Sequence, residues 1–191
     1  MLSFEAWLIL LHQLLFQGMF VTKNVVLRRR LGQPIRGANR EANRAIALFA
    51  VFIALSLALS LGLLTLGHVN LLPTGVARGI AVALLAANLL VSAASLRDLG
   101  DSWRVGVIEE QQTALVDTGI YGHSRNPYFL AYLLLLAAYT VLLQNVLLLI
   151  LSLLGFYMIH AMILREEEHL ARLHGEEYEK YCRKVARYFL V

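Results

Sequence analysis

The sequence has few of the residues that soluble and secreted folds depend on. It contains one cysteine, three prolines and 13 glycines in 191 residues, and only 16% of its residues are charged. A single cysteine, Cys182, cannot form an intrachain disulfide, which excludes a disulfide-stapled secreted fold. The low proline and glycine content also excludes collagen-like and low-complexity chains. An average soluble domain has about 25% charged residues, so the charge content is low for a soluble protein.

Hydrophobic residues are abundant instead, and they lie in long blocks. They make up 59% of the chain, against roughly 45–50% in an average soluble domain. A helix needs about 20 apolar residues to cross a bilayer, and the blocks near that length are 4–22, 45–66 and 79–96. A fourth block, 128–164, is too long for one crossing and predicts two antiparallel helices that turn at Gln144 and Asn145. The prediction is an all-α, polytopic membrane protein with about five transmembrane helices.

The charged loops predict the orientation. The segment 23–44 contains seven basic residues and a single acidic one, and basic loops stay on the cytoplasmic side. Five alternating crossings then place the N-terminus outside and the loop 97–125 and the tail from Arg165 in the cytoplasm. The tail Glu166–Val185 has apolar residues near helical spacing, which predicts an amphipathic helix at the membrane surface, with a break at Gly175. The basic loop is therefore interpreted as a topology signal that can also contact anionic membrane lipids, and nucleic-acid binding is not expected.

These predictions divide the chain into two parts. Residues 1–96 form three transmembrane helices with the basic loop 23–44, and residues 97–191 form a cytoplasmic loop, the helical hairpin 127–164 and the amphipathic helix. The hairpin should bring Arg125 beside Glu166–Glu168, although the two segments are far apart in the sequence. Ionisable groups at membrane depth are expensive, and by default they indicate a functional site.

Common catalytic motifs are missing from the sequence. The six histidines form no HxxxH or HxxHH set, so no metal site is expected. No GxSxG, GxxxxGK[ST] or GxGxxG occurs, which leaves no support for a serine elbow, a P-loop or a Rossmann-type site.

Several short stretches, in a specific order, resemble the isoprenylcysteine carboxyl methyltransferase family, whose signature is shared with phospholipid methyltransferases. They are Leu99–Arg104, Thr113–Tyr121 and Ser124–Phe129, followed by Glu166–Leu170 and by His174–Tyr178 with Tyr181. The resemblance covers about half of the chain. It implies an integral membrane enzyme that binds S-adenosylmethionine (SAM) at the cytoplasmic mouth of the hairpin.

The resemblance also implies site residues. By motif, the cofactor contacts of the family correspond to Thr113, Ala114, Leu115, Val116, Tyr121, Asn126, Pro127, Tyr128, Phe129 and Glu166. Arg125 and Glu167 are assigned to catalysis, with the planar fork of Arg125 holding a substrate carboxylate. Whether the Glu166–Glu168 cluster holds the ribose, holds the amino group or acts as a base stays open. The family's substrate-facing arginine falls on Met162, so Arg165 or Arg125 would have to supply that positive charge.

The leading functional hypothesis is methyl transfer to a carboxylate of a lipophilic, isoprenylcysteine-like substrate. The substrate, a small molecule or a prenylated one, would enter sideways from the bilayer. One alternative is a phospholipid or other amine N-methyltransferase on the same scaffold. Another is a non-catalytic membrane scaffold that uses the basic loop to hold a partner. The oligomeric state is left open.

Overall fold

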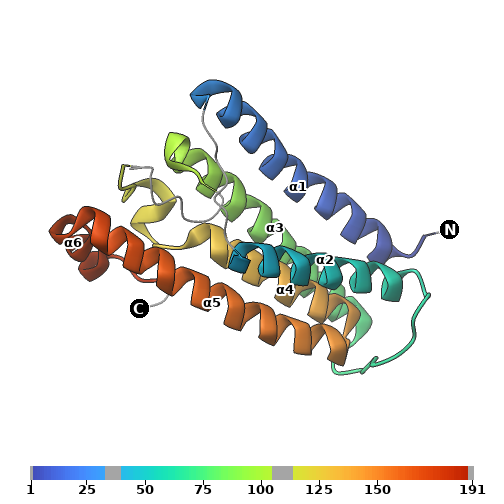
Figure 1. Cartoon of the computed structure of the whole chain (residues 1–191). Coiled ribbons are helices and arrows are strands. Elements are labelled where there is room, and N and C mark those ends of the chain that lie inside the picture. Colours follow the sequence, from blue (N-terminus) through green and yellow to red (C-terminus); the bar gives the residue numbers. More distant parts are fainter. Residues whose placement is uncertain (1, 33–39, 105–113, 189–191) are drawn as a thin grey trace.

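The computed structural model describes residues 2–32, 40–104 and 114–188, which form a helical bundle (Figure 1). The long helices are α1 (Phe4–Leu31), α2 (Arg40–Ser60), α3 (Thr74–Asp98), α4 (Pro127–Leu143) and α5 (Val146–His174). Two 3-10 turns, η1 (Gly100–Ser102) and η2 (Gly119–Gly122), lie between α3 and α4, and the short helix α6 (Glu176–Lys184) follows α5. Helix α3 packs on α4, and both α2 and α4 pack on α5.

The all-α membrane fold predicted from the sequence is confirmed. Four of the helices are long and apolar enough to cross a membrane, namely Phe4–Leu31, Ala42–Ser60, Thr74–Asp98 and Val146–His174. Helix α4 is even more apolar but has only 17 residues, which is at the lower end of the range for a crossing. The protein is therefore an integral membrane protein whose helices match the five predicted ones in number and order.

Three predicted boundaries are wrong. Helix α1 continues past residue 22 to Leu31, so the first part of the basic segment 23–44 is helix and not loop. Arg28, Arg29 and Arg30 occupy its last turn, where cations stabilise the negative end of the helix dipole. Helix α2 ends at Ser60 and not near residue 66, because the chain turns at Gly62, where φ is +71°.

The third boundary concerns the hairpin, which does not end at residue 164. Helix α5 runs on to His174, so Glu166–Glu168 belong to the hairpin helix and do not open a separate one. The residues from Arg165 to His174 include neither glycine nor proline, and nothing interrupts the helix until Gly175. At Gly175, φ is +52° and α6 begins directly afterwards, which confirms the predicted break.

The predicted turn at Gln144 and Asn145 is confirmed, and it also organises the loop between α2 and α3. Gln144 adopts the left-handed conformation, and the Asn145 side chain accepts hydrogen bonds from the first backbone N–H groups of α5. The Oε1 atom of Gln144 accepts from the backbone N–H of Leu71 and of Leu72, at 2.9 and 2.7 Å. These contacts pair backbone groups of residues 61–73, which would otherwise be costly in a membrane environment.

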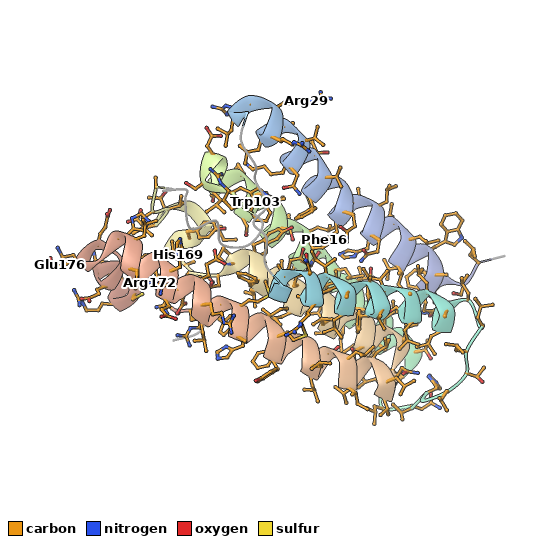
Figure 2. All side chains as sticks on the ribbon, in the orientation of Figure 1. Phe16, Arg29, Trp103, His169, Arg172 and Glu176 are labelled. Atoms are coloured by element: carbon orange, nitrogen blue, oxygen red, sulfur yellow. The ribbon has the colours of Figure 1, made fainter. Side chains whose placement is uncertain are left out.

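Charged side chains gather at one end of the bundle. Figure 2 shows Phe16 within the bundle and Arg29, Arg172 and Glu176 toward the end that carries α6. At the opposite end, the Asp, Glu, Lys and Arg residues within the described ranges are Glu5 and Arg78, which bond to each other at 2.9 Å. The predicted cytoplasmic side corresponds to the charge-rich end.

A buried polar network ties α1 to α3 and α4 in the apolar part of the bundle. The amide nitrogen of Asn88 donates to the carbonyl of Ala131 at 2.6 Å, so its oxygen accepts from Nε2 of His12 at 2.9 Å. Nδ1 of His12 then accepts from the hydroxyl of Tyr139 at 2.9 Å. His12, Asn88 and Tyr139 are all at most 2% exposed. The network satisfies their polar atoms internally and fixes the position of α1.

We expect Asn88→Leu to lower the free energy of unfolding by about 1–2 kcal/mol, because it leaves the buried Nε2 of His12 without an acceptor and removes the bond between α3 and the carbonyl of Ala131. Ser92→Ala is the matched control, since Ser92 is equally buried on α3 and its hydroxyl has no partner among the described residues. Thermal unfolding in detergent micelles measures both. Equal losses for the two variants would contradict the role assigned to the network.

Candidate active site

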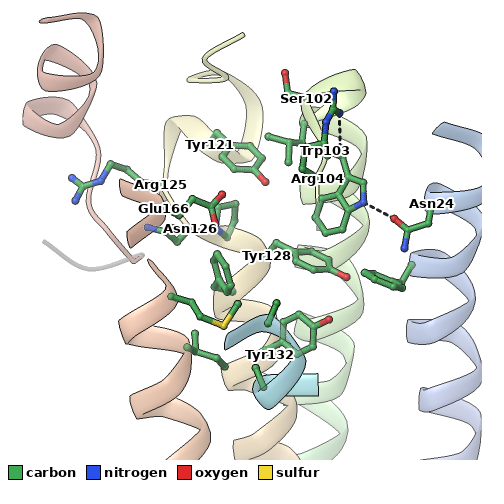
Figure 3. A pocket seen from close by; sticks show the side chains of 18 of the residues that line it. Asn24, Ser102, Trp103, Arg104, Tyr121, Arg125, Asn126, Tyr128, Tyr132 and Glu166 are labelled. Carbon is green, nitrogen blue, oxygen red and sulfur yellow. Dashed lines mark hydrogen bonds between the residues drawn. The ribbon is translucent and has the colours of Figure 1, made fainter. Parts of the chain in front are cut away.

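A pocket of about 720 Å³ lies at the charge-rich end of the bundle (Figure 3). Its walls come from α1, α2, the segment that follows α3, the first turns of α4 and the second half of α5. The volume is within the range of about 300–1,000 Å³ that is typical of small-molecule sites. The pocket is polar beside η2, and its part between α1 and α2, here called the apolar arm, is lined mostly by apolar side chains such as Phe16, Phe20, Ile46 and Phe49.

The turn η2 places Tyr121 at the polar end. Asp98, the last residue of α3, accepts a hydrogen bond from the backbone N–H of Ile120 at 2.9 Å. Gly119 has a φ of +61°, and a Cβ atom there would collide with the carboxylate of Asp98. The backbone carbonyl of Tyr121 accepts from the hydroxyl of Tyr181 on α6 at 2.7 Å. Two helices therefore hold this turn from opposite sides.

The phenol of Tyr121 stays protonated. Burial, and after it the negative charge of Glu166, raise the pKa of Tyr121 well above its ordinary value. Glu166 lines the same pocket from α5 and is half-buried. The polar end thus combines a hydroxyl, which can donate a hydrogen bond, with a carboxylate, which can accept one.

Asn126 lines the pocket immediately before Pro127 begins α4. Its amide nitrogen donates to Oε1 of Glu167 at 2.9 Å and to the backbone carbonyl of Arg187 at 3.3 Å. Both hydrogens of the amide are thereby engaged. The carbonyl oxygen of the amide is the part that remains for a ligand.

Arg125 is directed away from the centre of the pocket, as Figure 3 shows. Its Nε and Nη2 atoms donate to the two carboxylate oxygens of Glu167 at 3.2 and 3.3 Å. Its Nη1 atom donates to the backbone carbonyls of Val185 and Cys182 at 2.8 and 3.2 Å. The guanidinium group of Arg125, which was predicted to bind a substrate carboxylate, is instead hydrogen-bonded to Glu167 and to the end of α6. This geometry favours a structural role for Arg125 over direct contact with substrate.

Glu167 is not among the residues that line the pocket. It is 8% exposed and lies behind Asn126 and Arg125, paired with Arg125 and Arg187. A carboxylate in this position orients its neighbours, so its location favours a positioning role over the direct role predicted from the sequence.

Aromatic side chains form the wall where the polar end meets the apolar arm. The rings of Trp103 and Tyr128 meet edge to face, with centroids 4.6 Å apart, and Tyr132 stands against Tyr128 at 5.4 Å. The indole N–H of Trp103 donates to Asn24 on α1 at 2.8 Å. The hydroxyl of Tyr128 is buried and has no partner within the described part of the chain.

The structure brings most of the predicted cofactor residues together around the pocket. Those that line it are Ala114, Leu115, Val116, Tyr121, Asn126, Pro127, Tyr128, Phe129 and Glu166. Thr113 lies outside the described residues. Met162 and Arg165 line the pocket as well, one turn apart on α5.

Sequence reasoning missed two groups of residues. The first is the apolar arm, to which α1 contributes Phe16 and Phe20 and α2 contributes Ile46 and Phe49. In the sequence these residues cannot be told from others that face lipid. The second is Arg187, whose role depends on how the chain folds back after α6. Within residues 2–32, 40–104 and 114–188, no three His, Cys, Asp or Glu side chains are grouped as metal ligands.

A comparison of the sequence with known protein families shows which family the chain belongs to. The family described as Phospholipid methyltransferase matches residues 76–177, just over half of the chain. The chain belongs to the phospholipid methyltransferase family. This confirms the resemblance found in the sequence, because the family includes membrane methyltransferases of the isoprenylcysteine carboxyl type. A search among curated proteins finds no match to this chain.

The matched region of this membrane methyltransferase runs from α3 into α6. It therefore contains the polar end of the pocket, including Tyr121, Asn126 and Glu166. Helices α1 and α2, which form the apolar arm, lie outside it.

We expect Gly119→Ala to destabilise the methyltransferase by at least 1–2 kcal/mol, roughly the cost of a left-handed conformation for an L-residue. The clash with Asp98 adds to this cost and displaces the turn that carries Tyr121. Gly122→Ala is the control, because its Cβ would come no closer than 3.4 Å to any neighbour. Thermal unfolding of both variants tests this, and a Gly119→Ala variant as stable as Gly122→Ala would refute it.

Proposed function

We propose that the protein is a SAM-dependent methyltransferase that acts on a carboxylate of a lipophilic, isoprenylcysteine-like acceptor. The observation that carries the proposal is the pocket itself, in which a polar end joins an apolar arm. The polar end suits a hydrophilic cofactor, and the arm between α1 and α2 suits an acyl or prenyl chain. Membership of a methyltransferase family supplies the reaction class.

The residues at the polar end fit SAM. The carboxylate of Glu166 can accept from a ribose hydroxyl or from the ammonium group of the cofactor. The amide oxygen of Asn126 and the unpaired hydroxyl of Tyr128 offer further hydrogen bonds, and the ring of Trp103 offers a surface for adenine. When bound, SAM supplies an electrophilic methyl group on a sulfonium.

The charges around the pocket favour an anionic acceptor. Among the described residues that line the pocket, Arg28, Arg104 and Arg165 are basic in addition to Arg125, which is paired with Glu167, and Glu166 is acidic. Met162 stands where the family has an arginine, but Arg165 lines the pocket one helical turn further along α5. Arg165 can therefore supply the positive charge that a carboxylate requires at this position.

A carboxylate acceptor also simplifies the chemistry that the protein must perform. A carboxylate oxygen attacks without losing a proton, so no general base is needed. The apolar arm and the aromatic wall offer water few hydrogen-bond partners, and a site that excludes water favours a step that neutralises opposite charges. The remaining contribution of the protein is to hold the acceptor and the cofactor in line.

N-methylation of an amine lipid is the second candidate, and one observation favours it. Glu166 lies in the pocket, where it can take up the proton that an amine must lose.

Transfer of a radiolabelled methyl group by the purified protein in lipid nanodiscs distinguishes O-methylation of a carboxylate from N-methylation of an amine. A base-labile product is a methyl ester and supports the first proposal, whereas a base-stable product supports N-methylation. Absence of SAM binding in every lipid condition would favour the scaffold alternative.

We expect Glu166→Gln to weaken SAM binding about tenfold or more, because a hydrogen bond to a charged group contributes about 1.5–3 kcal/mol. Glu168→Gln is the matched control, since the Glu168 side chain is 67% exposed and pairs with Arg172 on the surface of α5. Calorimetric titration with SAM gives both dissociation constants. An unchanged constant for Glu166→Gln would remove Glu166 from the cofactor site.

A further inference from the structure

The segment that follows α6 folds back onto the start of α4. The backbone N–H of Arg125 donates to the carbonyl of Ala186 at 2.9 Å. The hydroxyl of Ser124 and the amide nitrogen of Asn126 both reach the carbonyl of Arg187, each at 3.3 Å. Residues 185–187 lie beyond the region matched by the family, yet they are bonded to the residues that open the pocket.

Glu167 connects the two segments through its side chain. Nε and Nη2 of Arg187 donate to its Oε2 atom at 3.0 and 2.9 Å. Arg125 donates to both oxygens from the other side, and Asn126 donates to Oε1. The Glu167 side chain is only 10% exposed, and a buried carboxylate is tolerated only when it is paired and hydrogen-bonded in this way.

We propose that Arg187 is a positioning residue, which fixes the side chain of Asn126 toward the pocket by holding the carboxylate of Glu167. This inference rests on the proposed function, because Asn126 matters only if the pocket binds SAM. Both hydrogens of the Asn126 amide go to acceptors that depend on Arg187: one is the carboxylate of Glu167, and the other is the backbone carbonyl of Arg187 itself. The amide oxygen is thereby left to face the pocket.

Loss of the Arg187 side chain has a specific consequence. Oε2 of Glu167 would lose two of its three donors among the described contacts and keep Nη2 of Arg125 at 3.3 Å. The carboxylate could then rotate, and the amide of Asn126 would keep as its fixed acceptor only the backbone carbonyl of residue 187 at 3.3 Å. If Arg187 only stabilised the fold, in contrast, its loss would lower the stability of the protein without a selective effect on SAM affinity.

A double-mutant cycle distinguishes these two roles. Arg187→Gln and Glu167→Gln should each raise the dissociation constant for SAM about tenfold, equivalent to roughly 1.4 kcal/mol. The double variant should bind no worse than the weaker single variant, because both changes break the same link. Arg187→Lys, which keeps the charge but not the fork, should recover part of the affinity at an unchanged melting temperature.

The surface pair Arg172 and Glu168, whose charged atoms are 3.6 Å apart, provides the matched control. Arg172→Gln, Glu168→Gln and their double variant remove the same charges from the same end of the bundle. They should leave SAM affinity unchanged.

Calorimetry and thermal unfolding in nanodiscs decide the outcome. An Arg187→Gln variant with the affinity of the parent, or additive effects in the cycle, would overturn the inference while leaving the proposed function intact. A parent protein that binds no SAM would overturn the proposed function and the inference together. If Arg187→Gln does not fold, Arg187→Lys decides, and an affinity equal to that of the parent then counts against the inference.

Discussion

The buried, charged side chain of Glu167 is tolerated only because its carboxylate is fully paired, and the residues around it are arranged to provide those partners. A buried charge without partners costs several kcal/mol. Here its partners are Arg125 and Asn126 before α4 and Arg187 after α6. These groups lie far apart in the sequence, and meeting at one carboxylate fixes the start of α4, the second half of α5 and the chain beyond α6 relative to one another.

The same constraint acts in two other parts of the bundle. His12, Asn88 and Tyr139, all buried, bond to one another between the helices, and the side chains of Gln144 and Asn145 pair backbone groups of Leu66, Leu71 and Leu72 at the opposite end. In each place a polar side chain from one helix satisfies a group on another segment. Apolar contact between helices provides little specificity in lipid, so these polar contacts determine which helices are neighbours.

The sequence predicted the parts of the fold that depend on local pattern. Apolar blocks predicted the helices, Gln144 and Asn145 predicted the turn, and Gly175 predicted the break before α6. It also placed Glu166 and Asn126 close together, because a hairpin brings the ends of its two helices to the same side. Hydropathy does not mark the residue that ends a helix, so both helix ends were missed: α1 continues past its apolar block until Gly32, whereas α2 stops before its block ends because the chain turns at Gly62.

The sequence could not predict the direction in which individual side chains point. The motif placed Arg125 at the mouth of the pocket, but its guanidinium turns toward Glu167 and the end of α6, where it finds a carboxylate and two backbone carbonyls. Which of Glu166 and Glu167 faces the ligand likewise depends on the rotation of α5, to which one residue contributes about 100°.

The fold-back of residues 185–187 affects the order in which the protein can be made. A nascent chain inserts its helices in sequence, and α4 and α5 are complete before this segment is synthesised. Until then Glu167 lacks the bonds that Arg187 provides, and the backbone N–H of Arg125 lacks the carbonyl of Ala186. The bonds that complete this end of the pocket therefore form only after α4 and α5 have been synthesised, and a chain cut within α6 keeps the residues of all five long helices but lacks these bonds.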